Sequence, residues 1–121
     1  MAVPHIYSQT EADAMHALGY VHASERLWQM DLLRRAGAGE LSELLGGDMV
    51  ENDIHLRSLG MQHAAERSSK AFEKEAPVHI KTAMSGYLDG INTFIAQNER
   101  PFEYQILGAV SYTHLTLPTK A

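Results

Sequence analysis

The stretch from Pro77 to Gln97 constrains the fold of this chain more than any other. Its apolar residues recur at spacings of three and four, as on one face of an α-helix; they are Ile80, Met84, Tyr87, Leu88, Ile91, Phe94 and Ile95. Pro77 suits the first turn of that helix, because the N–H groups of the first turn have no partner within the helix and proline lacks one. An apolar face this broad needs a partner surface. We therefore expect another element of the protein to cover it.

The residues before this helix also favour helical structure. Ser8 and Glu11 fit a capping box at the start of one helix. Ser24 is expected to cap a second helical segment, whose apolar stripe is formed by Leu27, Trp28, Met30, Leu32 and Leu33. The sequence therefore predicts two helical segments before residue 37.

Glycines divide the middle of the chain into further helical segments. Gly37 and Gly39 permit a turn, and a short helical turn is expected over residues 41–45. A longer helical stretch is expected over about residues 48–72. Gly60 predicts a break or bend in it, because glycine costs up to about 1 kcal/mol relative to alanine. With short extended pieces at the two ends, the expected fold class is mainly α.

Composition excludes several classes of function. The 121 residues make at most one ordinary domain, and the net charge of −5 argues against nucleic acid as a partner. Cysteine is absent, which excludes disulfides and thiolate chemistry. No apolar run approaches the roughly 20 residues that a membrane span needs. No signal peptide pattern is visible at the N-terminus.

No catalytic or metal-binding constellation emerges from the motifs. Ser85 comes nearest to a serine nucleophile, but it lies inside a helical pattern without the Gly-x-Ser-x-Gly turn. We interpret it as a small residue that allows close helix packing. Glu51 and His55, four apart, are interpreted as a surface ion pair because a third ligand is missing. The catalytic, cofactor-binding and metal-binding residues of this chain are therefore predicted to be none.

Five other side chains have structural interpretations that outweigh functional ones. His22 is expected to pack or hydrogen-bond rather than transfer protons. Arg26 and Arg34 are candidates for buried pairs with Glu25, Asp31 or residues of a missing chain, or for an ion-paired helix face. Trp28 and Met30 are interpreted as core residues rather than an acyl pocket. None of these interpretations requires a ligand.

Several motifs in order resemble one enzyme family. Gly19 to Gly46 (GYVHASERLWQMDLLRRAGAGELSELLG), the upstream Val-Pro-His-Ile-Tyr at residues 3–7 and the downstream Gly-Tyr-Leu-Asp-Gly-Ile-Asn at residues 86–92 carry the likeness. Over about residues 2–108, the chain resembles the N-terminal part of the α chain of the penicillin acylases, N-terminal-nucleophile hydrolases. This resemblance implies a fragment of an αββα sandwich protein with a truncated start.

The resemblance also implies where the chemistry resides. Such enzymes cleave the amide of β-lactam antibiotics or acyl-homoserine lactones with an N-terminal serine of a separate β chain, usually followed by asparagine. No Ser-Asn pair occurs here, so the fragment alone is expected to be inactive. The implied partners are the remainder of the α chain, the β chain and a small acyl-amide substrate. The implied location is periplasmic or secreted, and the family's calcium is expected to bind beyond this stretch.

Two expectations concern the extent of the chain and its alternative function. Residues 1–108 are assigned to a partial penicillin-acylase-like segment. Residues 109–121 are assigned to a non-native tail, because SYTHLTLPTKA resembles translated sequencing-adapter sequence. The alternative function is a freestanding, non-catalytic helical interaction module, which would bury the apolar face of residues 77–97 internally and remain a compact monomer.

Overall fold

The computed structural model describes residues 3–107 of the chain. Its elements are α1 (Glu11–Ala38), α2 (Leu41–Leu45), the 3-10 turn η1 (Gly47–Met49), α3 (Val50–Ser58), α4 (Met61–Glu75), α5 (Val78–Gln97) and α6 (Phe102–Ile106). Within these residues there is no β-strand, so the prediction of a mainly α chain is confirmed. The predicted tail lies outside the described residues and stays a prediction.

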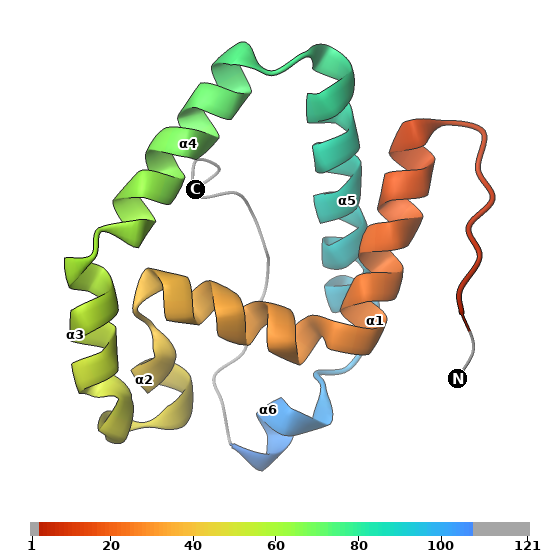
Figure 1. The fold of residues 1–121 in the computed structure, drawn as a ribbon. Helices are drawn as coiled ribbons and strands as arrows, with labels where there is room; N and C mark the ends of the chain where they lie inside the picture. Colours follow the sequence, from red (N-terminus) through yellow and green to blue (C-terminus); the bar gives the residue numbers. More distant parts are fainter. Residues whose placement is uncertain (1–2, 108–121) are drawn as a thin grey trace.

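Helix α1 is long and sharply bent. At Arg26 the backbone leaves the helical region, with φ −137° and ψ 20°. Figure 1 shows the first half of α1 beside α5 and the second half turning away toward α2 and α3. The predicted change of segment near Ser24 is therefore present. Its predicted cause is wrong, because the Ser24 hydroxyl donates back to the carbonyl of Val21 at 2.7 Å and does not cap.

The start of α1 also differs from the capping box predicted around Ser8. Thr10 is the N-cap, and its hydroxyl oxygen accepts from the N–H of Asp13 at 3.1 Å. Thr10 is the last residue with an extended backbone, which directs its oxygen to the free amides of the first turn. Ser8 lies two residues too early, and its hydroxyl donates to the Thr10 carbonyl instead.

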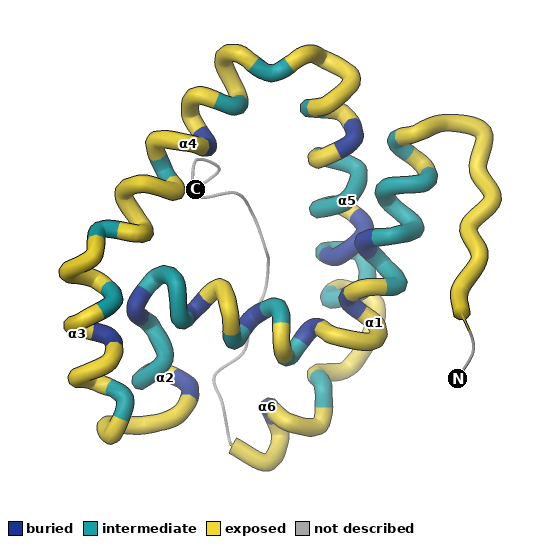
Figure 2. The backbone as a smooth tube through the Cα atoms, in the orientation of Figure 1, coloured by how far each residue is buried: buried dark blue, intermediate teal, exposed yellow. Residues whose placement is uncertain are grey.

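The partner surface that α5 needs is the first half of α1. Ala23, Leu27 and Ile91 are buried between the two helices, with Met30, Tyr87, Phe94 and Ile95 packed around them. Figure 2 shows buried positions on α1 and α5 where the two helices lie side by side. Three glycines allow this close approach. A Cβ at Gly86 would lie 2.7 Å from the carbonyl oxygen of Ala12, and a Cβ at Gly19 or Gly90 would overlap backbone atoms of the facing helix.

Two glycines in left-handed conformation divide the remaining helices. Gly39, with φ 70°, ends α1, and Gly60, with φ 71°, separates α3 from α4. Residues that carry a Cβ rarely adopt this left-handed backbone conformation. Both positions agree with the predicted turn and the predicted break. Figure 1 shows α3 and α4 rising as an arm on the side away from the first half of α1.

A second cluster lies along the part of α1 that follows the bend. Leu44 of α2 and Tyr104 of α6 are buried there, against Trp28 and Leu32 of α1. Trp28 and Tyr104 meet edge to face, with ring centroids 5.0 Å apart and planes at 89°. The chain thus contains two small apolar clusters joined by the bend at Arg26, and α6 belongs to the second.

Candidate functional site

The most deeply buried charged group of the described chain is the carboxylate of Asp31. Asp31 is 1% exposed, on the second half of α1. Its Oδ1 accepts from Arg34 at 2.6 Å and 3.1 Å, and its Oδ2 accepts from Nε of Arg35 at 3.1 Å. The hydroxyl of Tyr104 in α6 also donates to Oδ2. Helical spacings of three and four bring both arginines onto this carboxylate.

These contacts keep Asp31 ionised. Burial by itself raises the pKa of the carboxyl, but hydrogen bonds from Tyr104, Arg34 and Arg35 more than offset that effect and lower the pKa. Glu43 of α2 lies 3.2 Å from the Nη1 of Arg35 and extends the network. Each carboxylate oxygen of Asp31 already accepts hydrogen bonds, from Arg34 on one side and from Arg35 and Tyr104 on the other.

A second buried carboxylate, Asp53 of α3, holds the start of α2. Its two oxygens accept from the N–H groups of Leu41 and Ser42, both at 2.8 Å. Burial opposes ionisation here, while the hydrogen bonds to Ser42 and Leu41 and the nearby charge of Arg57 lower the pKa. Arg57 donates to the carbonyl of Gly39 at 2.9 Å. The hollow of about 150 Å³ beside these residues is lined by Ser42, Val50, Asp53, Ile54 and Arg57. Of these side chains, Asp53 and Arg57 already bond to the backbone.

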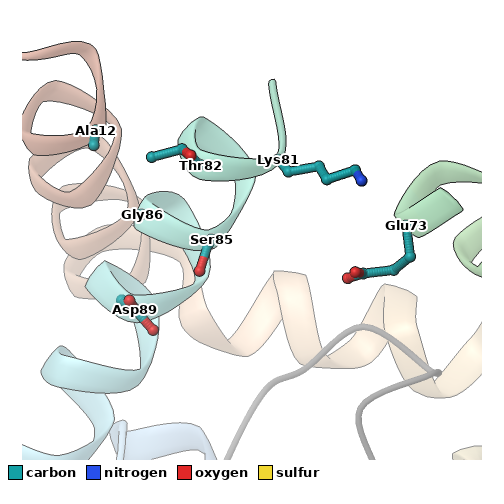
Figure 3. Close-up of a pocket in the computed structure, with 7 residues that line it drawn as sticks. All are labelled: Ala12, Glu73, Lys81, Thr82, Ser85, Gly86 and Asp89. Atoms are coloured by element: carbon teal, nitrogen blue, oxygen red, sulfur yellow. The ribbon is translucent and has the colours of Figure 1, made fainter. Parts of the chain in front are cut away.

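A larger groove of about 410 Å³ lies between α4, α5 and the start of α1. It is lined by Ala12, Glu73, Lys81, Thr82, Ser85, Gly86 and Asp89 (Figure 3). Lys81 extends toward Glu73 and away from Ser85. Asp89, four residues after Ser85 on α5, lines the same groove. The prediction that Ser85 lies within a helix is confirmed. The close backbone contact that was assigned to Ser85 is made by its neighbour Gly86.

The histidines do not assemble a metal site in the part of the chain that the structure describes. Among residues 3–107, no three His, Asp or Glu side chains are placed to hold one ion, so these residues do not fit the calcium of the resembled family. Glu51 and His55 are both exposed on α3. Within residues 3–107 no ion pair joins them, so that prediction is wrong: helical spacing permits such a pair, but exposed side chains gain little from forming it.

His22 hydrogen-bonds as expected. Its Nδ1 lies 3.0 Å from the hydroxyl oxygen of Tyr87, and the two rings pack edge to face with centroids 5.7 Å apart. This contact joins α1 to α5. Burial raises the pKa of the Tyr87 phenol, which keeps it protonated at neutral pH.

The predicted buried arginine pairs are partly wrong. Arg34 pairs with Asp31 as predicted, but its own side chain is 42% exposed, and Arg26 is exposed at the bend. The arginine that is buried is Arg35, 8% exposed. The Arg35 side chain is buried because α2 and α6 pack against the same part of α1. Trp28 and Met30 both pack in apolar clusters, in agreement with their interpretation as core residues.

Comparison with known proteins settles the family. The family model described as penicillin amidase matches residues 1–117. The chain belongs to the penicillin amidase family. The chain is 44% identical to penicillin acylase 2 proenzyme of Pseudomonas sp. (strain SE83) over 108 residues. It is 35% identical to acyl-homoserine lactone acylase QuiP of Pseudomonas fluorescens (strain Pf0-1) over 95 residues, and 33% identical to penicillin G acylase of Escherichia coli over 93 residues.

The chain spans only a small part of the length of each of these relatives. The matches cover 88%, 78% and 77% of this chain, but 13%, 11% and 10% of the three relatives. No helix within residues 3–107 is long and apolar enough to cross a membrane. Residues 3–107 form a helical segment. It is held by the buried carboxylates of Asp31 and Asp53 and by the crossing of α1 and α5, where glycines let the two backbones approach.

Two features of the candidate site have only weak signals in the sequence. Gly86 and Gly90 lie four apart inside the strongest helical pattern, which is a signal for close approach of another backbone. Asp31 and Arg35 also lie four apart and indicate an ion pair. Their burial depends on α2 and α6, which no local pattern reveals.

Proposed function

We propose that this chain is the N-terminal segment of an amidohydrolase precursor that cleaves acyl-amide bonds. The observation that carries the proposal is the family match over residues 1–117. The relatives are named as acylases of penicillin and of acyl-homoserine lactones, so an acyl amide of one of these kinds is the proposed substrate of the full-length protein. The name proenzyme for one relative agrees with a precursor that is processed.

In this proposal the segment supplies scaffold, and the catalytic groups lie elsewhere. The nucleophile is an N-terminal serine of a separate β chain, whose free α-amino group serves as the base. The serine attacks the amide carbonyl, an oxyanion hole stabilises the tetrahedral intermediate, and water hydrolyses the acyl-enzyme. The contribution of residues 3–107 is to fix helix positions through Asp31, Asp53 and the α1–α5 crossing. Any calcium ligands and the periplasmic or secreted location belong to the full-length protein.

Exposed apolar side chains support a segment over a freestanding module. Ile54 is 63% exposed and Leu59 is 59% exposed on the α3–α4 arm. The other large apolar side chains exposed on α3 to α5 are Val50, Met61, Val78, Ile80 and Met84. Solvent-exposed apolar patches of this kind mark surfaces that another part of a protein covers. The remainder of the α chain and the β chain are the proposed partners.

Sizing and thermal unfolding of the pure 121-residue chain distinguish the segment from the alternative module. A segment is expected to associate as its concentration rises and to lose helicity over a broad temperature range. A compact monomer with one sharp transition would favour the module. The same preparation should not hydrolyse a chromogenic phenylacetyl or fatty-acyl amide, and turnover in proportion to chain concentration would overturn the scaffold role.

A further inference from the structure

Helix α6 is attached to the rest of the protein by one buried side chain. It has five residues, far fewer than the roughly 12 that a helix needs to persist alone in water. Phe102 is 70% exposed and Ile106 is 65% exposed, whereas Tyr104 is 1% exposed. Tyr104 therefore provides the principal anchor of α6.

The anchor depends on a charge. The hydroxyl of Tyr104 donates to Oδ2 of Asp31, which is an acceptor on both oxygens only while it is ionised. The groups that face Asp31 are Arg34 and Arg35 from α1 and Tyr104 from α6. Two further carboxylates act on it through the arginines. Glu40 lies 3.7 Å from Nη1 of Arg34, and Glu43 of α2 reaches Arg35.

Protonation of Asp31 leaves one carbonyl oxygen as an acceptor, but it removes the negative charge that strengthens the Tyr104 hydrogen bond and that both arginines pair with. The pKa of Asp31 is lowered from its ordinary value of 3.8 by these same hydrogen bonds. The contribution of the contact is thus fully present above that ordinary value and is lost as the pH falls through the lowered one. The contact holds at neutral pH and fails only in acid.

The buried core of the α1–α5 pair does not depend on Asp31, and the His22–Tyr87 hydrogen bond also joins the two helices. The buried residues of this core are Ala23, Leu27 and Ile91, which carry no ionisable group. This cluster spans the bend at Arg26, and its residue Leu27 directly precedes Trp28 of the other cluster. Loss of the Asp31 charge therefore acts on the Trp28–Tyr104 cluster and leaves the cluster of Ala23, Leu27 and Ile91 in place.

We propose that α6 is an acid-releasable strap, which the Tyr104–Asp31 hydrogen bond holds on α1 and which protonation of Asp31 frees while the α1–α5 pair stays folded. This inference rests on the described contacts alone and is independent of the proposed acylase function.

Trp28 provides a direct readout of the strap. It is the only tryptophan, and its ring meets that of Tyr104 at 5.0 Å. We would titrate the 121-residue chain from pH 7 to pH 2 and record Trp28 emission and the ellipticity at 222 nm. The expected result is a shift of the emission to longer wavelength below the ordinary aspartate range, with most of the ellipticity retained.

Two variants and a control make the test specific. Tyr104→Phe keeps the ring but removes the donor, so its emission should be shifted already at pH 7 and change little in acid. Asp31→Asn should behave in the same way. Tyr7→Phe, at a tyrosine that is 91% exposed, should titrate like the parent chain.

Two results would overturn the strap. In one, emission and ellipticity of the parent chain change together, which means global unfolding. In the other, Tyr104→Phe titrates like the parent, which means that the hydroxyl does not hold α6. If Asp31→Asn fails to fold, the titration of Tyr104→Phe decides.

Discussion

Gly90 of α5 lies against the backbone of His16 in α1, so closely that a Cβ at Gly90 would overlap the carbonyl oxygen of His16. The contact joins two stretches that are far apart in the sequence. It sets the distance between the two helices that form the main apolar cluster. Backbone atoms cannot move aside as a flexible side chain can, so this position tolerates no side chain without a shift of a whole helix.

The first prediction concerns this crossing. Gly90→Ala should lower the free energy of unfolding by about 3 kcal/mol, the upper part of the range for overpacked cores. Gly37→Ala is the matched control, because no atom lies within 4 Å of the Cβ it would add. It should be neutral or stabilise by up to about 1 kcal/mol through helix propensity. Urea titrations followed at 222 nm at low protein concentration measure both, and equal midpoints for the two variants would contradict the packing account.

The second prediction concerns Tyr87 at the same interface. Burial raises the pKa of this phenol above its ordinary value of 10.0. Its contribution to stability is therefore fully present below pH 10 and is lost as the pH rises through the raised value. Tyr87→Phe removes the hydrogen bond with His22 and should cost about 0.5 to 1 kcal/mol at pH 8.

The comparison with Tyr7→Phe isolates this effect. Tyr7 is 91% exposed, so that variant should keep the alkaline loss of stability seen in the parent chain. Tyr87→Phe should show less of it between pH 9 and pH 12. An alkaline profile that is identical in the two variants would show that Tyr87 is not the responsible group.

The third prediction concerns the carboxylate that holds α2. Asp53→Asn replaces one of the two oxygens that accept from Leu41 and Ser42, and it should lower the urea midpoint clearly. Asp48→Asn, at an exposed aspartate in η1, should leave the midpoint nearly unchanged. Because the pKa of Asp53 is lowered, its contribution is present above the ordinary aspartate value and disappears as the pH falls through the lowered one. A parent chain and an Asp53→Asn variant that converge in acid would agree with this account, and a constant difference down to pH 2 would not.

Much of the fold follows from local patterns in the sequence. Helix α5 is predicted because its apolar period is long and Pro77 lies at its start. Gly39 and Gly60 mark helix ends because few other residues adopt their conformation. The start of α1 is misplaced by two residues, since Ser8 and Thr10 both precede a suitable acidic residue and only the backbone conformation selects between them.

The polar contacts are predicted less well because they depend on distant segments. Arg26 and Arg35 have the same chemistry, and only the packing of α2 and α6 buries the second. Helix α6 has five residues, which are too few to show the helical spacing of apolar positions. The sequence therefore indicates only that this segment is apolar. Its position depends on contacts of Tyr104 with distant residues, namely the apolar cluster with Trp28 and Leu44 and the hydrogen bond to Asp31 across 73 residues.

The central claim is that this segment serves an acylase as scaffold. The most direct test is a chimera in which residues 3–107 replace the matching region of the Pseudomonas penicillin acylase 2 proenzyme, to which the chain is 44% identical. The chimera should hydrolyse an acyl amide at a rate within about tenfold of the parent acylase, a difference of about 1.4 kcal/mol in barrier. The same chimera with Gly90→Leu should lose activity together with its fold. A soluble, folded chimera with no turnover, or an acylase that works equally well without the segment, would contradict the claim.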